Sequence, residues 1–594
     1  MGDAIRRAYR NLRSAPMFWL TATLSLSIGI GGNLAMFTVI NAVILRPLPF
    51  PDSDRLVLIT QANKYSTPYN PSVALAPIQF IRWRDGNQCF SSFAVIDGRE
   101  RVNLTGAGIP ETLGTLRISA DFFETLGVRP QRGRWFLRAE EKRGSRDVVI
   151  ISDALWRARF GADPEMIGRK IILNNAPYEV VGITPPDFRA FRSRELHPLL
   201  KLPLRTDVFV PIRFTEAEEK GWPMIIYLGI ARLKPGVSAA AAAAELTSKL
   251  PEIQFQSLGT PRVVTTLLPG IHDIVEPLQN VIAGDVRNGL LLLLLAVGLV
   301  LLISCVNVAN LSLVRAARRA RERAIMVALG ARKRDLIVSS LAESLILTLS
   351  ATVLGAILAS WAIAVIVSAA ASQVPRLEEA APDTRVFLFT VIVSAVATLL
   401  CGVLPAWKAS DAVPEGLMTA GREVTETRRS GRIHRTLVAA EVALGTVLAI
   451  GSGLVLISLY RVLKMPTGFE SDAVSLVNLS LPRTKYATMG QLNSFLDRAN
   501  QGVAAIPGVS GAAGSTATPF NAVGLFTPFL REGAEIGDAG WVLVSRPAVS
   551  ADYFRTMRIP LRAGRLFRDG EPEAVVVVSE CAARAFWSGD DPIG

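Results

Sequence analysis

The chain has 594 residues, half of them hydrophobic, and a formal net charge of +13. This length exceeds what one compact domain normally holds. The positive charge does not indicate nucleic-acid binding, because the lysines and arginines gather beside apolar segments, as the positive-inside rule expects. The composition therefore excludes a small soluble protein and favours membrane spans that alternate with folded domains.

Residues 17–45 are the first predicted membrane span. These residues carry no charge and follow a basic N-terminus, 1–16, that contains Arg6, Arg7, Arg10 and Arg13. A helix of this length exceeds the roughly 30 Å hydrocarbon core of a bilayer. A cleavable signal peptide also begins with basic residues, but its apolar region is only about 7–15 residues long. We therefore expect a retained anchor with the N-terminus in the cytoplasm.

Four further apolar segments complete the predicted membrane part. They are residues 289–314, 336–370, 386–407 and 436–460. The links 315–335 and 408–435 are rich in lysine and arginine, whereas 371–385 is not. The positive-inside rule then places the two basic links in the cytoplasm. Three segments are predicted to lie outside: residues 46–286, 371–385 and 461–594.

The outer segment 46–286 has the pattern of an α+β domain, with two subdomains. Short β-branched runs at 147–151 and 178–183 predict strands, and Asp85-Gly86 predicts a turn. Helical patterns are expected at 78–93 and 237–250. The predicted fold class is an α-helical transmembrane protein with α+β extracytoplasmic domains.

The sequence also repeats itself. Ser-Ala-Asp-Phe-Phe-Glu-Thr at 119–125 recurs as Ser-Ala-Asp-Tyr-Phe-Arg-Thr at 550–556, and Gly133-Arg134-Trp135-Phe136 recurs as Gly564-Arg565-Leu566-Phe567. Such repetition in a fixed order indicates a duplicated unit. Residues 461–594 are thus predicted to be an incomplete second copy of the outer domain. We expect the chain to be part of an eight-span protein.

No sequence motif predicts catalysis. The chain lacks a Gly-x-x-x-x-Gly-Lys-Ser/Thr loop for nucleotide phosphates, and the motifs His-Glu-x-x-His and Gly-x-Ser-x-Gly are absent. The three histidines are scattered, and the four cysteines form no Cys-x-x-Cys pair. Cys305 and Cys401 lie inside apolar segments, where a cysteine acts as a small buried hydrophobe. The sequence predicts a non-enzymatic chain without cofactor or metal.

Several residues inside the spans have two interpretations. Gly29, Gly31 and Gly32, and later Gly445, Gly451 and Gly453, would permit close helix contact, and Asn307 and Asn310 could bond a neighbouring helix. Glu343 and Glu441 are compatible with a proton relay. They also lie near the predicted cytoplasmic ends of their spans, where water and arginines are within reach, and we favour this second interpretation.

The link 315–335 is the segment most informative about function. Small residues recur at helical spacing at Ala317, Ala320, Ala324 and Ala328, and Gly330 is placed to end the helix. One interpretation is a basic helix attracted to anionic lipid. The other is a rigid lever on which a cytosolic partner pushes. Composition alone leaves both open.

Residues 321–336, Arg-Glu-Arg-Ala-Ile-Met-Val-Ala-Leu-Gly-Ala-Arg-Lys-Arg-Asp-Leu, resemble the coupling segment of FtsX-like permeases of the MacB type. Asn307-Val308-Ala309-Asn310-Leu311 is similar to part of the second span of that group. Arg46-Pro47-Leu48-Pro49-Phe50, followed by 119–123, resembles the MacB-type periplasmic core domain. The resemblance covers essentially the whole chain.

The resemblance implies a permease subunit in the inner cell membrane that works with a separate cytosolic ABC ATPase. Macrolide exporters of this family carry their own N-terminal ATPase domain, whereas this chain begins at the first span. ATP binding would move the coupling segments, and the long first helices would relay that motion to the outer domains. The residues assigned to ATPase coupling are Arg321, Glu322, Arg323, Ile325, Leu329, Gly330 and Ala331.

Two other functions remain open from the sequence. One is a transducer on the same scaffold that regulates cell division or the cell wall, and the other is a membrane receptor that has no ATPase partner. Membrane lipid and an outer partner or substrate are the other expected contacts. Nothing in the composition of the outer domains identifies that partner.

Overall fold

The computed structural model describes residues 2–593 apart from gaps at 63–73, 99–100, 107–108, 197–201, 221–226, 259–271, 319–332, 372, 412–427, 471–472, 480, 482–485, 487, 518, 520–525, 530–541, 569, 572–574 and 588–590. The chain divides into two units. The helical unit comprises Met1–Arg46 and Ala283–Met465, and the outer unit comprises Pro47–Ile282 and Pro466–Gly594.

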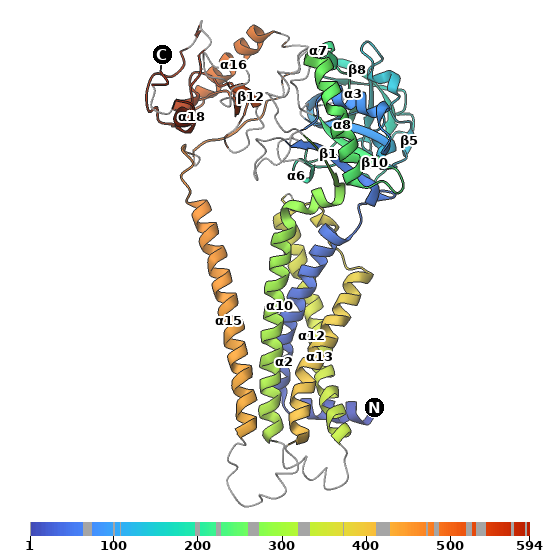
Figure 1. Cartoon of the computed structure of the whole chain (residues 1–594), viewed down its shortest axis with the longest axis vertical. Helices are drawn as coiled ribbons and strands as arrows, with labels where there is room; N and C mark the ends of the chain where they lie inside the picture. Colours follow the sequence, from blue (N-terminus) through green and yellow to red (C-terminus); the bar gives the residue numbers. More distant parts are fainter. Residues whose placement is uncertain are drawn as a thin grey trace, which may run out of the picture. The chain divides into compact units, whose positions relative to one another are not determined.

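The helical unit is built from long apolar helices (Figure 1). Its helices are α1 (Gly2–Arg13), α2 (Pro16–Ile40), α10 (Leu278–Arg318), α12 (Lys333–Ala370), α13 (Thr384–Asp411) and α15 (Arg428–Leu463). Stretches long and apolar enough to cross a membrane are Pro16–Leu45, Val286–Arg315, Ile337–Ala370, Thr384–Gly402 and Val438–Leu463. The expected transmembrane α-helical fold is confirmed, while the direction in which the helices cross stays a prediction.

Helix α2 lies among α10, α12 and α13 and touches α12 through its backbone (Figure 1). A Cβ atom on Gly31 would lie 2.8 Å from the carbonyl oxygen of Gly355, and one on Gly355 would lie 3.0 Å from the carbonyl oxygen of Ser27. Asn33 Nδ2 donates to the carbonyl oxygen of Val297 on α10 at 2.8 Å. In a bilayer the hydrophobic effect does not drive helices together. Close contact at small residues and hydrogen bonds from amide side chains hold them together instead. The predicted packing role of Gly31 is confirmed.

Helices α12 and α13 are joined by paired hydroxyl groups. Thr348 and Thr398 lie 2.6 Å apart at their Oγ1 atoms, and Thr352 Oγ1 lies 2.8 Å from Ser394 Oγ. Each of the two threonines on α12 also donates to a carbonyl one turn earlier, so its hydroxyl is satisfied within the apolar layer. Cys305 and Cys401 are both buried here, as predicted.

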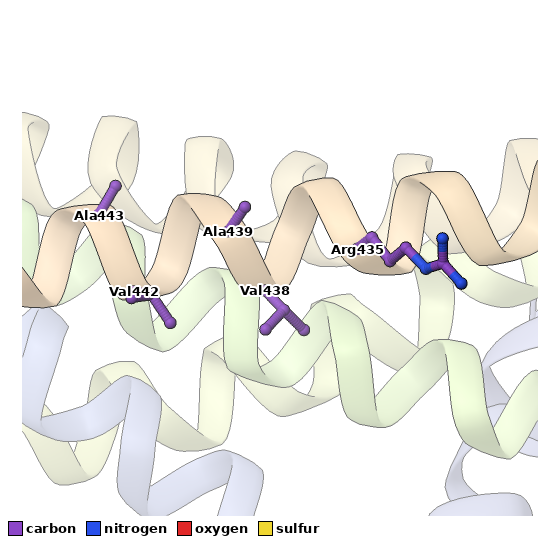
Figure 2. A pocket seen from close by; sticks show the side chains of 5 residues that line it. All are labelled: Arg435, Val438, Ala439, Val442 and Ala443. Carbon is purple, nitrogen blue, oxygen red and sulfur yellow. The ribbon is translucent and has the colours of Figure 1, made fainter.

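Helix α15 differs from the other four spans. None of its most apolar stretch is buried, and no atom of another described helix lies within 4 Å of where a Cβ on Gly445, Gly451 or Gly453 would be. One of its faces, formed by Arg435, Val438, Ala439, Val442 and Ala443, borders an open hollow of about 610 Å³ (Figure 2). The predicted packing role of these glycines is therefore not seen in the described part of the chain.

The first part of the outer unit is an eleven-stranded sheet with short helices. Its strands are β1 (Leu56–Ala62), β2 (Phe90–Asp97), β3 (Arg101–Thr105), β4 (Glu111–Ile118), β5 (Arg132–Gly133), β6 (Val148–Ile151), β7 (Lys170–Leu173), β8 (Ala176–Ile183), β9 (Val208–Pro211), β10 (Leu228–Leu233) and β11 (His272–Pro277). Its helices are α3 (Pro77–Gly86), α4 (Phe122–Leu126), α5 (Asp153–Phe160), α6 (Ser193–Leu196), α7 (Glu216–Lys220) and α8 (Ala239–Leu258).

The first part of the outer unit has three hydrophobic cores, and two of them lie on opposite faces of the sheet at β1. Successive residues of a strand point to opposite faces, and in β1 Leu56 and Leu58 enter one core while Val57 and Ile59 enter the other. Helices α3 and α8 cover the second face (Figure 1). Because both faces are covered, β1 is apolar through most of its length rather than alternating. The expected α+β fold is confirmed.

The strands beyond β2 continue the same sheet, and one hydrophobic core includes Leu56 of β1 and Phe209 of β9, so the structure does not show the two expected subdomains as separate units. The strands of the sheet lie in the order β11-β1-β10-β2-β4-β3-β7-β8-β6-β9. The strands from β4 to β9 close into a ring, because β9 also pairs in parallel with β4. The strands predicted at 147–151 and 178–183 are present as β6 and β8, and the helix predicted at 237–250 is present as α8. The helix predicted at 78–93 is wrong in its second half. Helix α3 ends at Gly86, and Phe90 already begins β2.

The repeat reappears as repeated local structure in the second part of the outer unit. Arg134 holds Glu140 through two hydrogen bonds of 3.0 and 2.6 Å, and Arg565 holds Glu571 through two of 2.7 and 3.0 Å. Gly133 and Gly564 precede these arginines with φ of +75° and +79°. A left-handed conformation of this kind favours glycine. The described elements here are α16 (Met489–Ala504), β12 (Phe526–Phe529), β13 (Val542–Ser545), α17 (Tyr553–Thr556) and α18 (Glu580–Phe586).

The contact between Gly31 and Gly355 gives a first prediction. Gly31→Ala should destabilise the helical unit by roughly 1–3 kcal/mol, because its methyl group would press on backbone that cannot rotate away. The thermal unfolding midpoint of the full chain in detergent measures this. Gly32→Ala is the matched control, since its Cβ would meet Val297 Cγ1 at an ordinary 3.7 Å. Equal midpoints for the two variants would contradict the packing.

A second prediction concerns pH. Asp273 on β11 is buried and accepts hydrogen bonds from Gln61 Nε2 at 2.8 Å and Thr247 Oγ1 at 3.3 Å. Burial raises the pKa of Asp273 to about 7, although both hydrogen bonds act in the opposite direction. An unfolded aspartate has a pKa of about 3.9. The folded protein therefore keeps a proton that the unfolded chain releases, and the free energy of unfolding should fall as the pH rises from about 4 to about 7.

Asp273→Asn should flatten this pH dependence, which amounts to a few kcal/mol at most because one pKa unit corresponds to about 1.4 kcal/mol. Chemical unfolding of the full chain between about pH 4 and pH 8 measures the slope. Glu276→Gln, at an exposed position of the same strand, is the control and should keep the wild-type slope. An unchanged slope in Asp273→Asn would refute the assignment.

Candidate functional site

The predicted coupling residues connect two spanning helices. Arg321, Glu322, Arg323, Ile325, Leu329, Gly330 and Ala331 lie in the gap at 319–332, outside the described residues. Helix α10 ends before this segment at Arg318, and α12 begins after it at Lys333. The candidate site is therefore described through the ends of these two helices and the residues that contact them.

Helix α1 packs beside these helix ends. Ala8 is buried against Ala342 of α12, and Leu12 is buried in the core that includes Cys305 of α10 and Leu347 of α12. The sequence predicts only a charged terminus at 1–16, whereas the structure has a helix there. Ile5, Ala8 and Leu12 recur at spacings of three and four residues, which was the available signal of an amphipathic helix.

A polar cluster of Asn11, Arg315 and Glu343 joins three helices at this point. Asn11 Nδ2 donates to Glu343 Oε1 at 2.8 Å. Arg315 Nη2 donates to the main-chain oxygen of Asn11, and its Nη1 lies 4.0 Å from Glu343 Oε2. Both charged side chains are largely buried, with 15% and 25% of their surfaces exposed. A partly buried charge needs a partner, and each of these charges has one.

The same arginine also reaches α2. Its guanidinium carbon lies 4.8 Å above the ring centre of Phe18, which is cation–π distance. Arg315 thus contacts α1, α2 and α12 from its own position near the end of α10. The structure agrees with the interpretation that Glu343 lies within reach of an arginine. The polar cluster was not predicted, because Asn11 is more than 300 residues from both Arg315 and Glu343 in the sequence.

The opposite end of α2 is held by a second polar cluster. Here α2 continues into a π-helix, Asn41–Leu45, and Asn41 Nδ2 donates to Asp383 Oδ2 at 2.7 Å. Arg385 donates to the carbonyl oxygen of Leu45 at 2.7 Å, and Arg376 donates to that of Arg46 at 2.8 Å. The main-chain N–H of Val386 and the Asn41 amide hold the pKa of Asp383 below its usual value, although partial burial opposes them.

Helices α2 and α10 enter the outer domain through neighbouring strands. The chain leaves α2 at Leu45 and forms β1 from Leu56, while β11 ends at Pro277, directly before α10. Strands β1 and β11 pair in antiparallel register from Val57↔Pro277 to Ala62↔His272. A relative movement of the two helices would therefore act on one hydrogen-bonded strand pair.

Helix α2 is held among its neighbours by several kinds of non-covalent contact. A cation–π contact at Phe18, the backbone contact at Gly31, the hydrogen bond of Asn33 and the ring contact of Phe37 tie α2 to its neighbours along its length. Among the described residues no group of three or more His, Cys, Asp or Glu side chains is arranged to hold a metal ion. A set of packed helices with polar contacts at both ends can pass a displacement between distant segments.

Two family descriptions match this chain. The MacB-like periplasmic core domain matches residues 19–249, and the FtsX-like permease C-terminal domain matches residues 294–414. The first match covers α2 and most of the first part of the outer unit, and the second covers most of α10, the segment 319–332, α12 and α13.

Curated relatives agree over the same region. The macrolide export ATP-binding/permease protein MacB of Burkholderia pseudomallei (strain 1710b) is 27% identical over 289 residues, which cover 49% of this chain and 40% of the relative. The protein of the same name from Escherichia coli (strain K12) is 26% identical over 238 residues, 40% of this chain and 33% of the relative. The chain thus matches well under half the length of these relatives.

Solved structures with similarity include two outer domains. The periplasmic region of MacB from Actinobacillus actinomycetemcomitans shares 14% identity, with 40% of this chain and 94% of that one covered and a TM-score of 0.27. The extracellular domain of the noncanonic ABC-type transporter YknZ from Gram-positive bacteria shares 12% identity, with 34% and 95% covered and a TM-score of 0.24.

The polar cluster gives a third prediction. Glu343→Ala should loosen α1 from the bundle, because Asn11 and Arg315 lose their shared acceptor. Hydrogen bonds to charged groups contribute about 1.5–3 kcal/mol, so brief trypsin treatment of the full chain in detergent should cleave after Arg10 or Arg13 about tenfold faster. Glu441→Ala, which removes a carboxylate from α15 instead, is the control. Equal cleavage rates would show that Glu343 does not hold α1.

Proposed function

Because the chain belongs to the FtsX-like, MacB-type permeases, we propose that it couples ATP hydrolysis by a separate cytosolic ABC ATPase to movement of its outer domains. The observation that carries the proposal is the order of the two matched domains along one chain, a periplasmic core domain followed by an FtsX-like permease domain. In this proposal the chain has no catalytic residue of its own, and export or efflux is the work that it performs.

The ATPase would act on the segment 319–332. This segment lies within the permease match and connects α10 to α12, so a push on it is passed directly to two spanning helices. The cluster of Asn11, Arg315 and Glu343 would pass the same push to α1 and α2. Arg321, Glu322 and Leu329 are the proposed contact residues. The two charged side chains would fix the register of the ATPase on the segment, and Leu329 would insert into an apolar pocket of the ATPase.

The outer domain would receive the motion through β1 and β11. These strands follow α2 and precede α10, respectively, and they pair with each other. A shift of one helix relative to the other would shear or tilt the pair. Since β1 contributes to two of the three cores of the domain, such a tilt would change the packing on both faces of the sheet. This would be the mechanical output of the subunit.

The proposed orientation puts α1 and the segment 319–332 in the cytoplasm of an inner membrane. It rests on the lysines and arginines that gather on one side of the apolar helices, whereas the loop near Asp383 carries more acids than bases. Labelling of a thiol introduced at residue 320 by an impermeant reagent added from outside would contradict this orientation and the proposed function with it.

The fourth prediction tests the coupling. Tagged full chain should co-purify with an ABC ATPase from its own cells, and Glu322→Ala and Leu329→Ala should each lower the permease-dependent ATP turnover in membranes. Mutations along a coupling route change coupling by about 0.5–2 kcal/mol, or roughly 2- to 30-fold. Arg422→Ala, in the other basic link, is the control. If no ATPase is retained and turnover is unchanged in all variants, the chain acts as a receptor and the proposal fails.

A further inference from the structure

A groove of about 650 Å³ lies between α1 and α12. It is lined by Ile5, Arg6, Tyr9, Arg10 and Ile346. Four of these residues belong to α1 and one to α12. The first four are solvent-exposed although two of them, Ile5 and Tyr9, are large hydrophobic residues. An apolar surface beside two cations calls for a ligand that offers both an anionic group and a hydrocarbon part.

Helical spacing explains why these side chains meet. Residues four apart lie on one face of a helix, so Arg6 and Arg10 form one row and Ile5 and Tyr9 form the adjacent row. Ala8 and Leu12 lie on the face buried against the bundle. The groove therefore has a cationic row on α1, an apolar row next to it, and Ile346 of α12 as a further apolar wall.

The groove is held in place by contacts outside it. Asn11 bonds Glu343, and Ala8 packs on Ala342, so α1 cannot roll on α12 without breaking them. The Tyr9 ring meets the Trp19 ring edge-on, with centroids 6.1 Å apart. Tyrosine and tryptophan prefer the boundary between lipid and water. The Glu343 carboxylate, one turn before Ile346, is engaged by Asn11 and Arg315, so it does not neutralise the groove arginines.

We propose that this groove binds an anionic phospholipid. The phosphate of the headgroup lies between Arg6 and Arg10, whose guanidinium groups match phosphate oxygens. The first part of an acyl chain lies along Ile5 and Ile346, and the tyrosine borders the headgroup. The groove is open rather than enclosed, which suits a ligand that exchanges with the surrounding lipid. The inference stands independently of the proposed ATPase coupling.

The fifth prediction measures lipid retention. Full chain is reconstituted in phosphatidylcholine with added phosphatidylglycerol, extracted gently, and examined by native mass spectrometry for bound lipid. Phosphatidylglycerol should be retained in preference to phosphatidylcholine. An arginine near an anionic membrane contributes about fivefold to binding, so Arg6→Gln and Arg10→Gln should each weaken retention by about that factor. These arginines are exposed, so the variants should fold normally.

Arg13→Gln is the matched control. It removes the same charge from the same helix at an exposed position that does not line the groove, and it should retain phosphatidylglycerol like the wild type. An equal loss in Arg13→Gln would overturn the groove in favour of general charge attraction. Equal retention of both lipids would overturn the anionic ligand. Displacement of phosphatidylglycerol by inorganic phosphate alone would show a simple anion site and overturn the lipid assignment.

Discussion

Backbone contact between α2 and α12 is the constraint on which the helical unit depends. At Gly31 and Gly355 the two main chains meet with no side chain between them, so neither helix can rotate or slide without opening the contact. Side-chain contacts then build outward from it, with Asn33 bonding α10 and Phe37 stacked on Phe389 of α13 at a centroid distance of 3.9 Å. In a bilayer, where lipid is as apolar as the protein surface, such close packing and internal hydrogen bonds replace the hydrophobic effect as the force between helices. Helices α2, α10, α12 and α13 therefore form one packed bundle, with α2 as its central member.

The outer unit shows how one local design is used twice. In each copy a glycine with positive φ precedes an arginine that grips a glutamate six residues later, and the glutamate also accepts a main-chain N–H. In each copy a serine caps the next helix, Ser152 for α5 and Ser579 for α18. These features need only a few neighbouring residues, so they form wherever the local sequence recurs. The broad sheet is different, because β6 requires β8 and β9 from later in the chain.

The sequence predicted what depends on neighbouring residues and missed what depends on distant ones. Uncharged length identifies the spans, and β-branched runs identify β6 and β8. The end of α3 at Gly86 was missed because the predicted helix was extended to Phe93 across Asp85-Gly86, although this pair predicts a turn and the residues up to Gln88 are polar. Helix α1 was missed because its buried face consists mainly of Ala8 and Leu12, and the four arginines between and beside them weaken the apolar pattern. The cluster of Asn11, Arg315 and Glu343 could not be predicted, since only the packed bundle brings these three positions together. The coupling residues at 321–331 came from resemblance and lie outside the described residues, so they remain a prediction.

The π-helix at the end of α2 carries a consequence for the direction in which the chain continues. A π-turn holds one residue more than an α-turn, and each residue of an α-helix turns the chain by ~100°. The additional residue therefore sets the rotational phase at which Arg46 departs, and it aims the last carbonyl groups at Arg376 and Arg385. Removing a single residue between positions 41 and 45 would leave an ordinary helix with all its internal bonds, yet would point those carbonyl groups elsewhere. The number of residues in the π-helix thus determines the direction in which the chain leaves α2.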